Sequence, residues 1–284
     1  MLGHAVAGAF LEVGHAVAGC GTRDRQVLAL PGEIRYERYA FESWDPEAIA
    51  RLIGDAEVVI QLAAYTRVDQ AEAEPLLAHR TNALFAQAVA RACEITGADL
   101  LYVSTDYVFD GRAGRSYREW DATAPASVYG QSKLAGELAV RRIPRHYIVR
   151  TSWLFGEHGP NFVATILKAG REQPELKVVN DQFGSPTYTG DLARAIARLV
   201  TTRRYGVYHL TNRGITTWFD FACEIFRQKG VATPVLPRST ADAGRPAPRP
   251  PYSVLENWAW QVAGEELLPA WEDALGRYLV RSLR

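Results

Sequence analysis

Tyr129 and Lys133 are the two residues whose types and spacing most clearly suggest chemistry, in the run Tyr129-Gly-Gln-Ser-Lys133. An i, i+4 spacing at the start of a helix puts the phenol and the ammonium on the same face. A lysine beside a tyrosine lowers the pKa of the phenol, which can then protonate the alkoxide that forms when hydride reduces a ketone. The pair alone is weak evidence, because a surface tyrosine packed on a lysine stem is the commoner arrangement.

Hydroxyl side chains at the end of a buried apolar run strengthen this interpretation. The run LLYVS ends at Ser104 and is followed directly by Thr105, Asp106 and Tyr107. These hydroxyls would lie at the carboxyl end of a parallel strand, where ligands bind in this kind of sheet. We therefore predict that Ser104 or Thr105 hydrogen-bonds the carbonyl oxygen of a substrate.

The elements that must position these residues alternate between short apolar runs and longer helical patterns. This order is typical of an α/β fold, a parallel sheet covered by helices on both faces. The expected strands are residues 15–20, 58–62, 100–104 and 147–151, the last three being continuous apolar runs typical of strands buried on both faces. The expected helices are residues 82–95, with Gly97 as the C′ glycine, and residues 130–142. Right-handed crossovers then predict a doubly wound, Rossmann-like sheet.

The pattern loosens after residue 153 into loops with glycine, proline and aromatic residues. We expect residues 1–153 to form a dinucleotide-binding domain. Residues 154–284 should form a smaller, mainly substrate-binding lobe, with some segments returning to the first domain. Further helices are expected at residues 162–169, 191–201, 217–229 and 268–280. Residues 243–254, AGRPAPRPPYSV, are too rich in proline for a helix or central strand and should be extended and tied down.

Composition narrows the class of partner. The chain has 32 basic and 32 acidic residues, so no polycationic field attracts nucleic acid or anionic lipid, and a small neutral or anionic molecule is expected as the partner.

No apolar run approaches the roughly 18 residues of a membrane span. The three cysteines form no CxxC pair, which fits the reducing cytoplasm. The histidines have no metal-ligand spacing, so we predict no metal site and a structural role for His79 and His209.

Six segments follow one another along the chain: VVIQLAAYTRVDQAEAEP, LLYVSTDYVFDG, SVYGQSKLAGE, VRTSWLFG, VVNDQFGSPTYTGDLA and YHLTNRGITTWFDFA. In this order they closely resemble the dTDP-4-dehydrorhamnose reductases of the extended short-chain dehydrogenase/reductase superfamily. The YxxxK pair is shared with the whole superfamily, whereas STDYVFDG, RTSW and DQxGxPTY are more specific. The resemblance implies NADPH-dependent reduction at C4 of dTDP-4-dehydrorhamnose to dTDP-L-rhamnose, and it allows a homodimer.

The resemblance also implies roles for single residues. By the resemblance, the residues that correspond to the family's catalytic residues are Thr105, Tyr129 and Lys133. Tyr129 would protonate the carbonyl oxygen, Lys133 would bind the nicotinamide ribose and stabilise the tyrosinate, and Thr105 would orient the carbonyl. The implied cofactor-binding residues are Gly3, Arg23, Ala63, Ala64, Tyr65, Tyr129 and Lys133. The implied substrate-binding residues are Thr66, Val68, Ser104, Thr105 and Trp153.

Two of these assignments have structural alternatives. Small side chains at Ala63 and Ala64 would let the backbone approach the cofactor, but they would equally allow close helix packing. Trp153 would line the sugar site or belong to the core. Arg23 lies where a basic residue admits NADPH, while the neighbouring Asp24 leaves NADH as an alternative.

The chain departs from the family pattern at two places. Met1-Leu2-Gly3 corresponds only to the end of the family's G-x-x-G-x-x-G turn, so we expect the first strand and two of the turn's glycines to be missing. Either the start of the sequence is too late or normal cofactor binding has been lost; the intact downstream sequence favours the first explanation. Gln61-Leu62 also replaces the usual Asn-Ala, which affects local cofactor contacts.

Two other functions remain alternatives to the reductase. The incomplete glycine turn would suit a non-catalytic, reductase-like regulatory subunit, although such a protein needs none of Thr105, Tyr129 and Lys133. A nucleotide-sugar epimerase or dehydratase of the same superfamily is the other alternative. Dehydratases need a further acid/base pair after the threonine, and Asp106-Tyr107 matches the reductase pattern instead.

Overall fold

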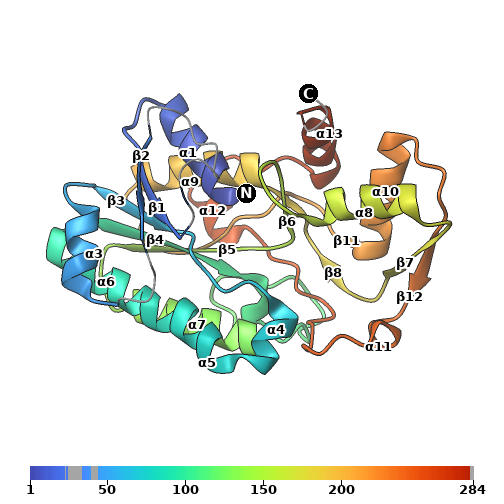
Figure 1. Cartoon of the computed structure of the whole chain (residues 1–284), viewed down its shortest axis with the longest axis horizontal. Helices are drawn as coiled ribbons and strands as arrows, with labels where there is room; N and C mark the ends of the chain where they lie inside the picture. Colours follow the sequence, from blue (N-terminus) through green and yellow to red (C-terminus); the bar gives the residue numbers. More distant parts are fainter. Residues whose placement is uncertain (23, 25–33, 40–43, 282–284) are drawn as a thin grey trace.

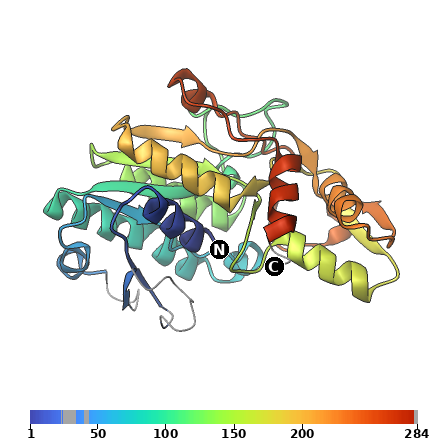
Figure 2. The same ribbon diagram turned by 90° about the horizontal axis from the view of Figure 1, so that it is seen from above.

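The computed structural model describes residues 1–22, 24, 34–39 and 44–281. Over these residues, a parallel sheet carries helices on both faces, and a smaller group of helices and short strands lies to one side (Figures 1 and 2). The predicted doubly wound α/β fold is therefore confirmed.

The central sheet has four parallel strands in the order β10-β5-β4-β3. They are β3 (Val58–Gln61), β4 (Asp99–Thr105), β5 (His146–Thr151) and β10 (Gly206–His209). β4 and β5 are almost wholly buried, whereas β3, at the edge of this sheet, is half-buried. Thr105 pairs with Thr151, so β4 and β5 end together at one edge of the sheet, where the predicted site lies.

β1 (Ala18–Gly21) and β2 (Arg35–Arg38) form a separate parallel pair. Among the described residues, no backbone ladder joins β1 to β3, and the two sheets stay distinct. The strand expected at residues 15–20 begins later, because the amide of His15 bonds the carbonyl of Phe10 and still belongs to the end of the preceding helix.

Helices cover the two faces of the sheet as separate layers (Figure 1). On one face α1, α9 and α12 pack with the sheet in a core that contains Val6, Leu192 and Trp260. On the other face α3 and α6 pack in a core that contains Ile49 and Phe85, with α7 beside them. These helices are α1 (Leu2–Glu12), α3 (Pro46–Ile53), α4 (Val68–Ala73), α5 (Pro75–His79), α6 (Phe85–Thr96), α7 (Val128–Val140), α9 (Thr189–Thr201) and α12 (Trp258–Val262).

The helix expected at residues 82–95 is longer and begins irregularly. A π-helical turn, η1 (Arg80–Leu84), joins α5 to α6, and Gly97 ends α6 in the left-handed conformation, as predicted. The helix expected at residues 130–142 begins earlier, because the Ser127 hydroxyl accepts a hydrogen bond from the amide of Gly130 and caps α7 at Val128.

The smaller lobe is built around aromatic residues, among them Phe155, Phe221 and Trp271. Its elements are β6 (Leu154–Phe155), α8 (Phe162–Glu172), β7 (Leu176–Val179), β8 (Phe183–Gly184), β9 (Thr187–Tyr188), β11 (Thr216–Thr217), α10 (Trp218–Lys229), β12 (Val235–Arg238), α11 (Thr240–Ala243) and α13 (Trp271–Arg281). α13 starts later than expected, because Arg213 binds the carbonyls of Leu268 and Pro269. No helix in the described part of the chain is long and apolar enough to cross a bilayer.

Residues 243–254, called here the proline-rich segment, are extended beyond the end of α11 and fixed at several points. Tyr252 forms a bridge with Phe183 of β8, and the carbonyl of Val254 accepts a hydrogen bond from the amide of Tyr117. Arg249 forms a bidentate ion pair with Asp69 of α4, with both N to O distances 2.9 Å. The segment therefore connects the smaller lobe to the carboxyl edge of the sheet.

Candidate active site

Helix α7 is fixed over the end of β4 by close packing at the first turn of the helix. A Cβ atom on Gly130 would lie 2.2 Å from the carbonyl oxygen of Tyr107, so only glycine allows this approach. Tyr107 belongs to the 3-10 turn η2 (Asp106–Val108), directly after β4. The rings of Tyr107 and Tyr129 meet edge to face, with centroids 5.5 Å apart. The fold thus brings Tyr129 to the end of β4.

Lys133 is buried behind Tyr129 on the same helix, only 2% exposed. Its Nζ donates to the carbonyl of Val103 at 2.7 Å and lies 3.9 Å from the centroid of the Tyr102 ring. Burial lowers the pKa of the ammonium to about 7, although the nearby carboxylate of Glu137 opposes this shift. The proton on Lys133 is therefore weakly held.

The expected lowering of the Tyr129 pKa is not found. Burial raises the pKa of the Tyr129 phenol to about 12, and the charge of Asp106 raises it further. A hydrogen bond with the Thr105 hydroxyl acts in the opposite direction. The prediction that Lys133 lowers this pKa was wrong here because desolvation outweighs the other influences.

Thr105 and Asp106 form a buried hydrogen-bonded pair beside Tyr129. Thr105 Oγ1 donates to Asp106 Oδ1 at 3.0 Å and accepts from the amide of Tyr107 at 3.2 Å. Ser253 Oγ donates to Asp106 Oδ2 at 2.6 Å. Burial raises the pKa of the Asp106 carboxyl to about 6, against the lowering influence of these hydrogen bonds.

Ser104 has a different partner from the one expected. Its hydroxyl donates to Glu137 Oε1 at 2.6 Å, under α7. Consecutive residues of a strand point to opposite faces, so Ser104 and Thr105 cannot both face the phenol. Of the two predicted hydroxyls, only that of Thr105 acts on the pKa of Tyr129.

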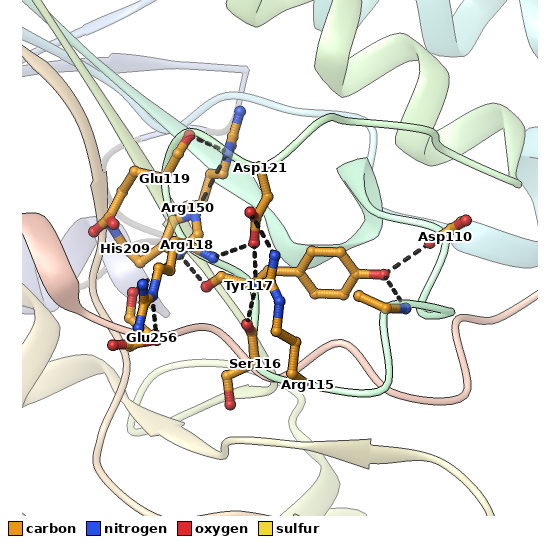
Figure 3. Close-up of polar contacts among 11 residues, drawn as sticks. Asp110, Arg115, Ser116, Tyr117, Arg118, Glu119, Asp121, Arg150, His209 and Glu256 are labelled. Carbon is orange, nitrogen blue, oxygen red and sulfur yellow. Dashed lines mark hydrogen bonds and ion pairs between the residues drawn. The ribbon is translucent and has the colours of Figure 1, made fainter.

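A buried ion pair between Glu137 and Arg150 continues from Ser104 into the sheet. Figure 3 shows the Arg150 end of this group, with Glu119, Tyr117 and His209 around it. Arg150 donates to Glu137 through Nε at 2.9 Å and Nη2 at 2.7 Å, and Nη1 bonds the carbonyl of Glu119. Nη1 also lies 3.4 Å from His209 Nε2, while His209 Nδ1 meets the carbonyls of Tyr117 and Glu256. Burial and the charge of Arg150 lower the pKa of His209 to about 3, so the ring is neutral between its backbone partners.

Asn82, in the π-helical turn η1, links the expected cofactor segment to α7. Its Oδ1 accepts from the amide of Tyr65 at 2.7 Å, and its Nδ2 donates to the Tyr65 carbonyl at 3.1 Å and to Ser132 Oγ at 2.9 Å. The Asn82 carbonyl accepts from Tyr102 Oη at 3.0 Å. One fully buried side chain thus fixes the backbone of Tyr65 against the helix of Tyr129 and Lys133.

The remaining expected cofactor residues lie around the end of β3. Ala63, Ala64 and Tyr65 follow this strand, and Tyr65 Oη donates to Glu74 at 2.6 Å. Gly3, in the first turn of α1, faces Leu62, whose Cδ1 would lie 3.7 Å from an added Cβ. That turn has neither an acidic residue nor a side-chain cap, so its amides suit a pyrophosphate. These residues therefore fit a dinucleotide. Arg23 lies outside the described residues.

The other expected substrate residues lie at two places along the first part of the chain. Thr66 is exposed next to Tyr65, and Val68 starts α4 half-buried. Trp153 follows β5 with a left-handed backbone, at a φ of 47°, and stacks on Trp218 with centroids 3.6 Å apart. The ring lies between the carboxyl edge of the sheet and the smaller lobe; its contact with a sugar stays a prediction.

Three of the residues that hold this group together were not predicted from the sequence: Asn82, Glu137 and Ser253. Glu137 follows Lys133 at i+4, so a second charge on the same apolar helix face was the available signal. Asn82 is a polar residue within an alanine-rich helical pattern, and this also could have been noticed. Ser253 gave no signal, because its partner Asp106 is 147 positions away in the sequence.

The parallel sheet with a tyrosine and lysine on one helix, beside a threonine at a strand end, defines an extended short-chain dehydrogenase/reductase fold. The chain belongs to the dTDP-4-dehydrorhamnose reductase family, a family of oxidoreductases: the model of the RmlD substrate binding domain matches residues 1–283.

Similar proteins cover most of the chain. The dTDP-4-dehydrorhamnose reductase of Streptomyces griseus is 47% identical over 227 residues, 77% of this chain and 74% of that protein. The reductase of Mycobacterium tuberculosis (strain ATCC 25618 / H37Rv) is 42% identical over 274 residues, 93% of this chain and 88% of that protein. The crystal structure of the Bacillus anthracis reductase in complex with NADP is 37% identical, with a TM-score of 0.86, and covers 94% of this chain and 99% of that one.

Proposed function

We propose that this protein uses NADPH to reduce the C4 keto group of dTDP-4-dehydrorhamnose, giving dTDP-L-rhamnose. The observation that carries the proposal is the group of Thr105, Tyr129 and Lys133 at the carboxyl edge of β4. Relatives named as dTDP-4-dehydrorhamnose reductases, at 36% to 47% identity, support the choice of substrate.

The three side chains have different roles in the reduction of a carbonyl group. The nicotinamide supplies hydride to the C4 carbon when it is bound. Tyr129 donates its phenolic proton to the C4 oxygen as negative charge develops there. Lys133 would bind the nicotinamide ribose and stabilise the tyrosinate left after proton transfer. Thr105 hydrogen-bonds the phenol and orients the carbonyl beside it.

NADPH is the proposed cofactor, with NADH as the alternative. The NADP bound by the Bacillus anthracis reductase supports this preference, and so does the basic Arg23 in the sequence. Asp24, the acidic neighbour that would favour NADH, lies 3.4 Å from Arg38 in an exposed ion pair that partly neutralises it.

We further propose that residues 1–153 bind the dinucleotide and that residues 154–284 mainly bind the sugar. Thr66, Val68 and Trp153 would contact the sugar where these two parts meet. The balanced charge of the chain favours a nucleotide sugar over nucleic acid as partner. The three cysteines are unpaired, so we place the protein in a reducing cytoplasm. A measurement of mass in solution decides whether it is a homodimer.

The absorbance of NADPH tests the function directly. Purified protein is mixed with NADPH and dTDP-4-dehydrorhamnose, and we expect one NADPH oxidised for each dTDP-L-rhamnose formed. An epimerase or dehydratase would change the sugar without net loss of NADPH. A regulatory subunit would leave both compounds unchanged. Either result would overturn the proposed reductase activity.

A further inference from the structure

The proline-rich segment reaches the proton-transfer group through one side chain. Ser253 is 2% exposed, and its hydroxyl donates to Asp106 Oδ2 at 2.6 Å. Its backbone is held independently, because the amide of Ser253 donates to the carbonyl of Phe183 at 3.0 Å. The hydroxyl is therefore fixed against Asp106 by its own element.

The hydrogen bonds around Asp106 have a defined direction. A hydroxyl carries one proton, and that of Thr105 is donated to Asp106 Oδ1. While it is, Thr105 Oγ1 can only accept a hydrogen bond from the phenol of Tyr129, and the donation by Thr105 that lowers the pKa of Tyr129 is lost. If Asp106 is protonated instead, Asp106 donates to Thr105 and the proton of Thr105 turns toward Tyr129. The charge of Asp106 thus decides whether Thr105 opposes or assists proton donation by the phenol.

We propose that Ser253 is a positioning residue of the reductase. Its hydroxyl fixes the orientation of the Asp106 carboxylate and stabilises its ionised form, and Asp106 in turn sets the direction of the Thr105 proton. The proposal rests on the proposed function. It gives the proline-rich segment a role in chemistry, since the hydrogen-bonded series Ser253, Asp106, Thr105 begins on that segment and ends at the hydroxyl that acts on the pKa of Tyr129.

Other titratable groups near Asp106 are already engaged. Tyr107 on η2 and Tyr129 on α7 are neutral phenols whose pKa values the charge of Asp106 raises further. Arg249, on the proline-rich segment, faces Tyr107 and forms its bidentate ion pair with Asp69 of α4. Ser253 is therefore the neighbour from the segment that donates directly to the Asp106 carboxylate.

The first test is the pH dependence of turnover with saturating NADPH and keto sugar. We expect turnover to fall as the pH rises through the pKa of Asp106, since ionised Asp106 takes the Thr105 proton. Ser253→Ala removes a donor to the carboxylate and should move this fall upward by about one pH unit. Ser253→Thr, which keeps the hydroxyl, should restore the original position. Asp106→Asn should abolish the fall.

A matched control is Ser239→Ala. Ser239 also donates to an aspartate, Asp242 Oδ2 at 2.7 Å, but this pair is exposed at the start of α11. The control should leave the pH profile unmoved. A fall that stays in place in Ser253→Ala, or a pH profile of Asp106→Asn identical to that of the wild type, overturns the proposal. A second fall caused by Lys133 would be the same in the wild type and Ser253→Ala.

The second test needs no turnover. Denaturant unfolding of the wild type, Ser253→Ala, Asp106→Asn and the double variant forms a double-mutant cycle, measured at about pH 5 and about pH 8. We expect Ser253→Ala to cost more stability at the higher pH, where Asp106 is ionised, and the difference to vanish in the Asp106→Asn background. An equal cost at both pH values overturns the link between Ser253 and Asp106. If the wild type reduces no keto sugar, the proposed function fails while this cycle still decides the link.

Discussion

Ser132 Oγ accepts a hydrogen bond from Asn82 Nδ2 at 2.9 Å and donates to the carbonyl of Tyr129 at 2.8 Å. The same Asn82 side chain bonds both the amide and the carbonyl of Tyr65. The π-helical turn before α6 therefore sets the distance between the segment expected to hold the cofactor and the helix that carries Tyr129. π-helical turns of this kind frequently occur at functional sites.

Asn82→Ala should weaken NADPH binding and turnover together. The change leaves the Tyr65 amide and carbonyl without their buried partner, which costs about 1 to 3 kcal/mol in stability and loosens the segment of Ala63 to Tyr65. Calorimetric titration with NADPH and steady-state kinetics measure the two effects. Asn180→Ala, at an exposed asparagine, is the control. Unchanged cofactor affinity in Asn82→Ala would show that Asn82 supports only the fold.

Tyr129→Phe should keep the fold and the cofactor affinity but lower turnover by about two orders of magnitude or more, because only the proton donor is lost. The measurement is kcat for NADPH oxidation with the keto sugar. Tyr208→Phe serves as the matched control, since its hydroxyl bonds the Arg204 carbonyl at 2.7 Å away from the site. More than about a tenth of wild-type turnover in Tyr129→Phe would exclude Tyr129 from proton donation.

Lys133→Met should lower both turnover and NADPH affinity, because the ammonium is expected to hold the ribose and stabilise the tyrosinate. Lys133→Arg should not restore either property, since a planar guanidinium cannot take the position of a compact ammonium. Isothermal titration and steady-state rates measure these losses. Lys168→Met, at a side chain 75% exposed, is the control. Normal cofactor affinity in Lys133→Met would assign Lys133 to the protein core alone.

Lys133 should also make the stability of the cofactor-free protein depend on pH. Its folded pKa of about 7 lies below the ordinary 10.5, so between these values the unfolded chain binds more protons. The free energy of unfolding should therefore rise with pH from about 7 upward, by at most roughly 1.4 kcal/mol per pH unit. Urea unfolding of the wild type and Lys133→Met across this range should show the contribution in the wild type only. Parallel curves would contradict the lowered pKa.

Gly136→Ala should destabilise the protein by about 1 to 3 kcal/mol or more. The new Cβ would lie 2.3 Å from both the carbonyl oxygen of Asn82 and the hydroxyl of Tyr102, so α7 must shift away from η1. Thermal unfolding measures the loss. Gly8→Ala is the matched control, because Gly8 lies within α1 with nothing within 4 Å of its Cβ position, and alanine there should be neutral or slightly stabilising. Equal melting temperatures for the two variants would contradict the close packing at Gly136.

The sequence by itself determined the features that depend on local periodicity. Apolar runs located β4 and β5, Gly97 marked the end of α6, and the i, i+4 spacing placed Tyr129 and Lys133 on one helix. Each of these depends on backbone geometry within a few residues. Element boundaries were less certain, because caps such as Ser127 and long-range bonds such as those of Arg213 decided them.

Only the tertiary structure decided which polar groups meet and in which ionisation state. Ser104 and Thr105 are neighbours in the sequence, yet the strand directs one to Glu137 and the other to Asp106. Ser253 reaches Asp106 from the far end of the chain, and burial raises the pKa of Tyr129 where a neighbouring lysine alone predicted a lower one. Contacts distant in sequence and the loss of water around a charge arise from packing, which no local pattern of residues records.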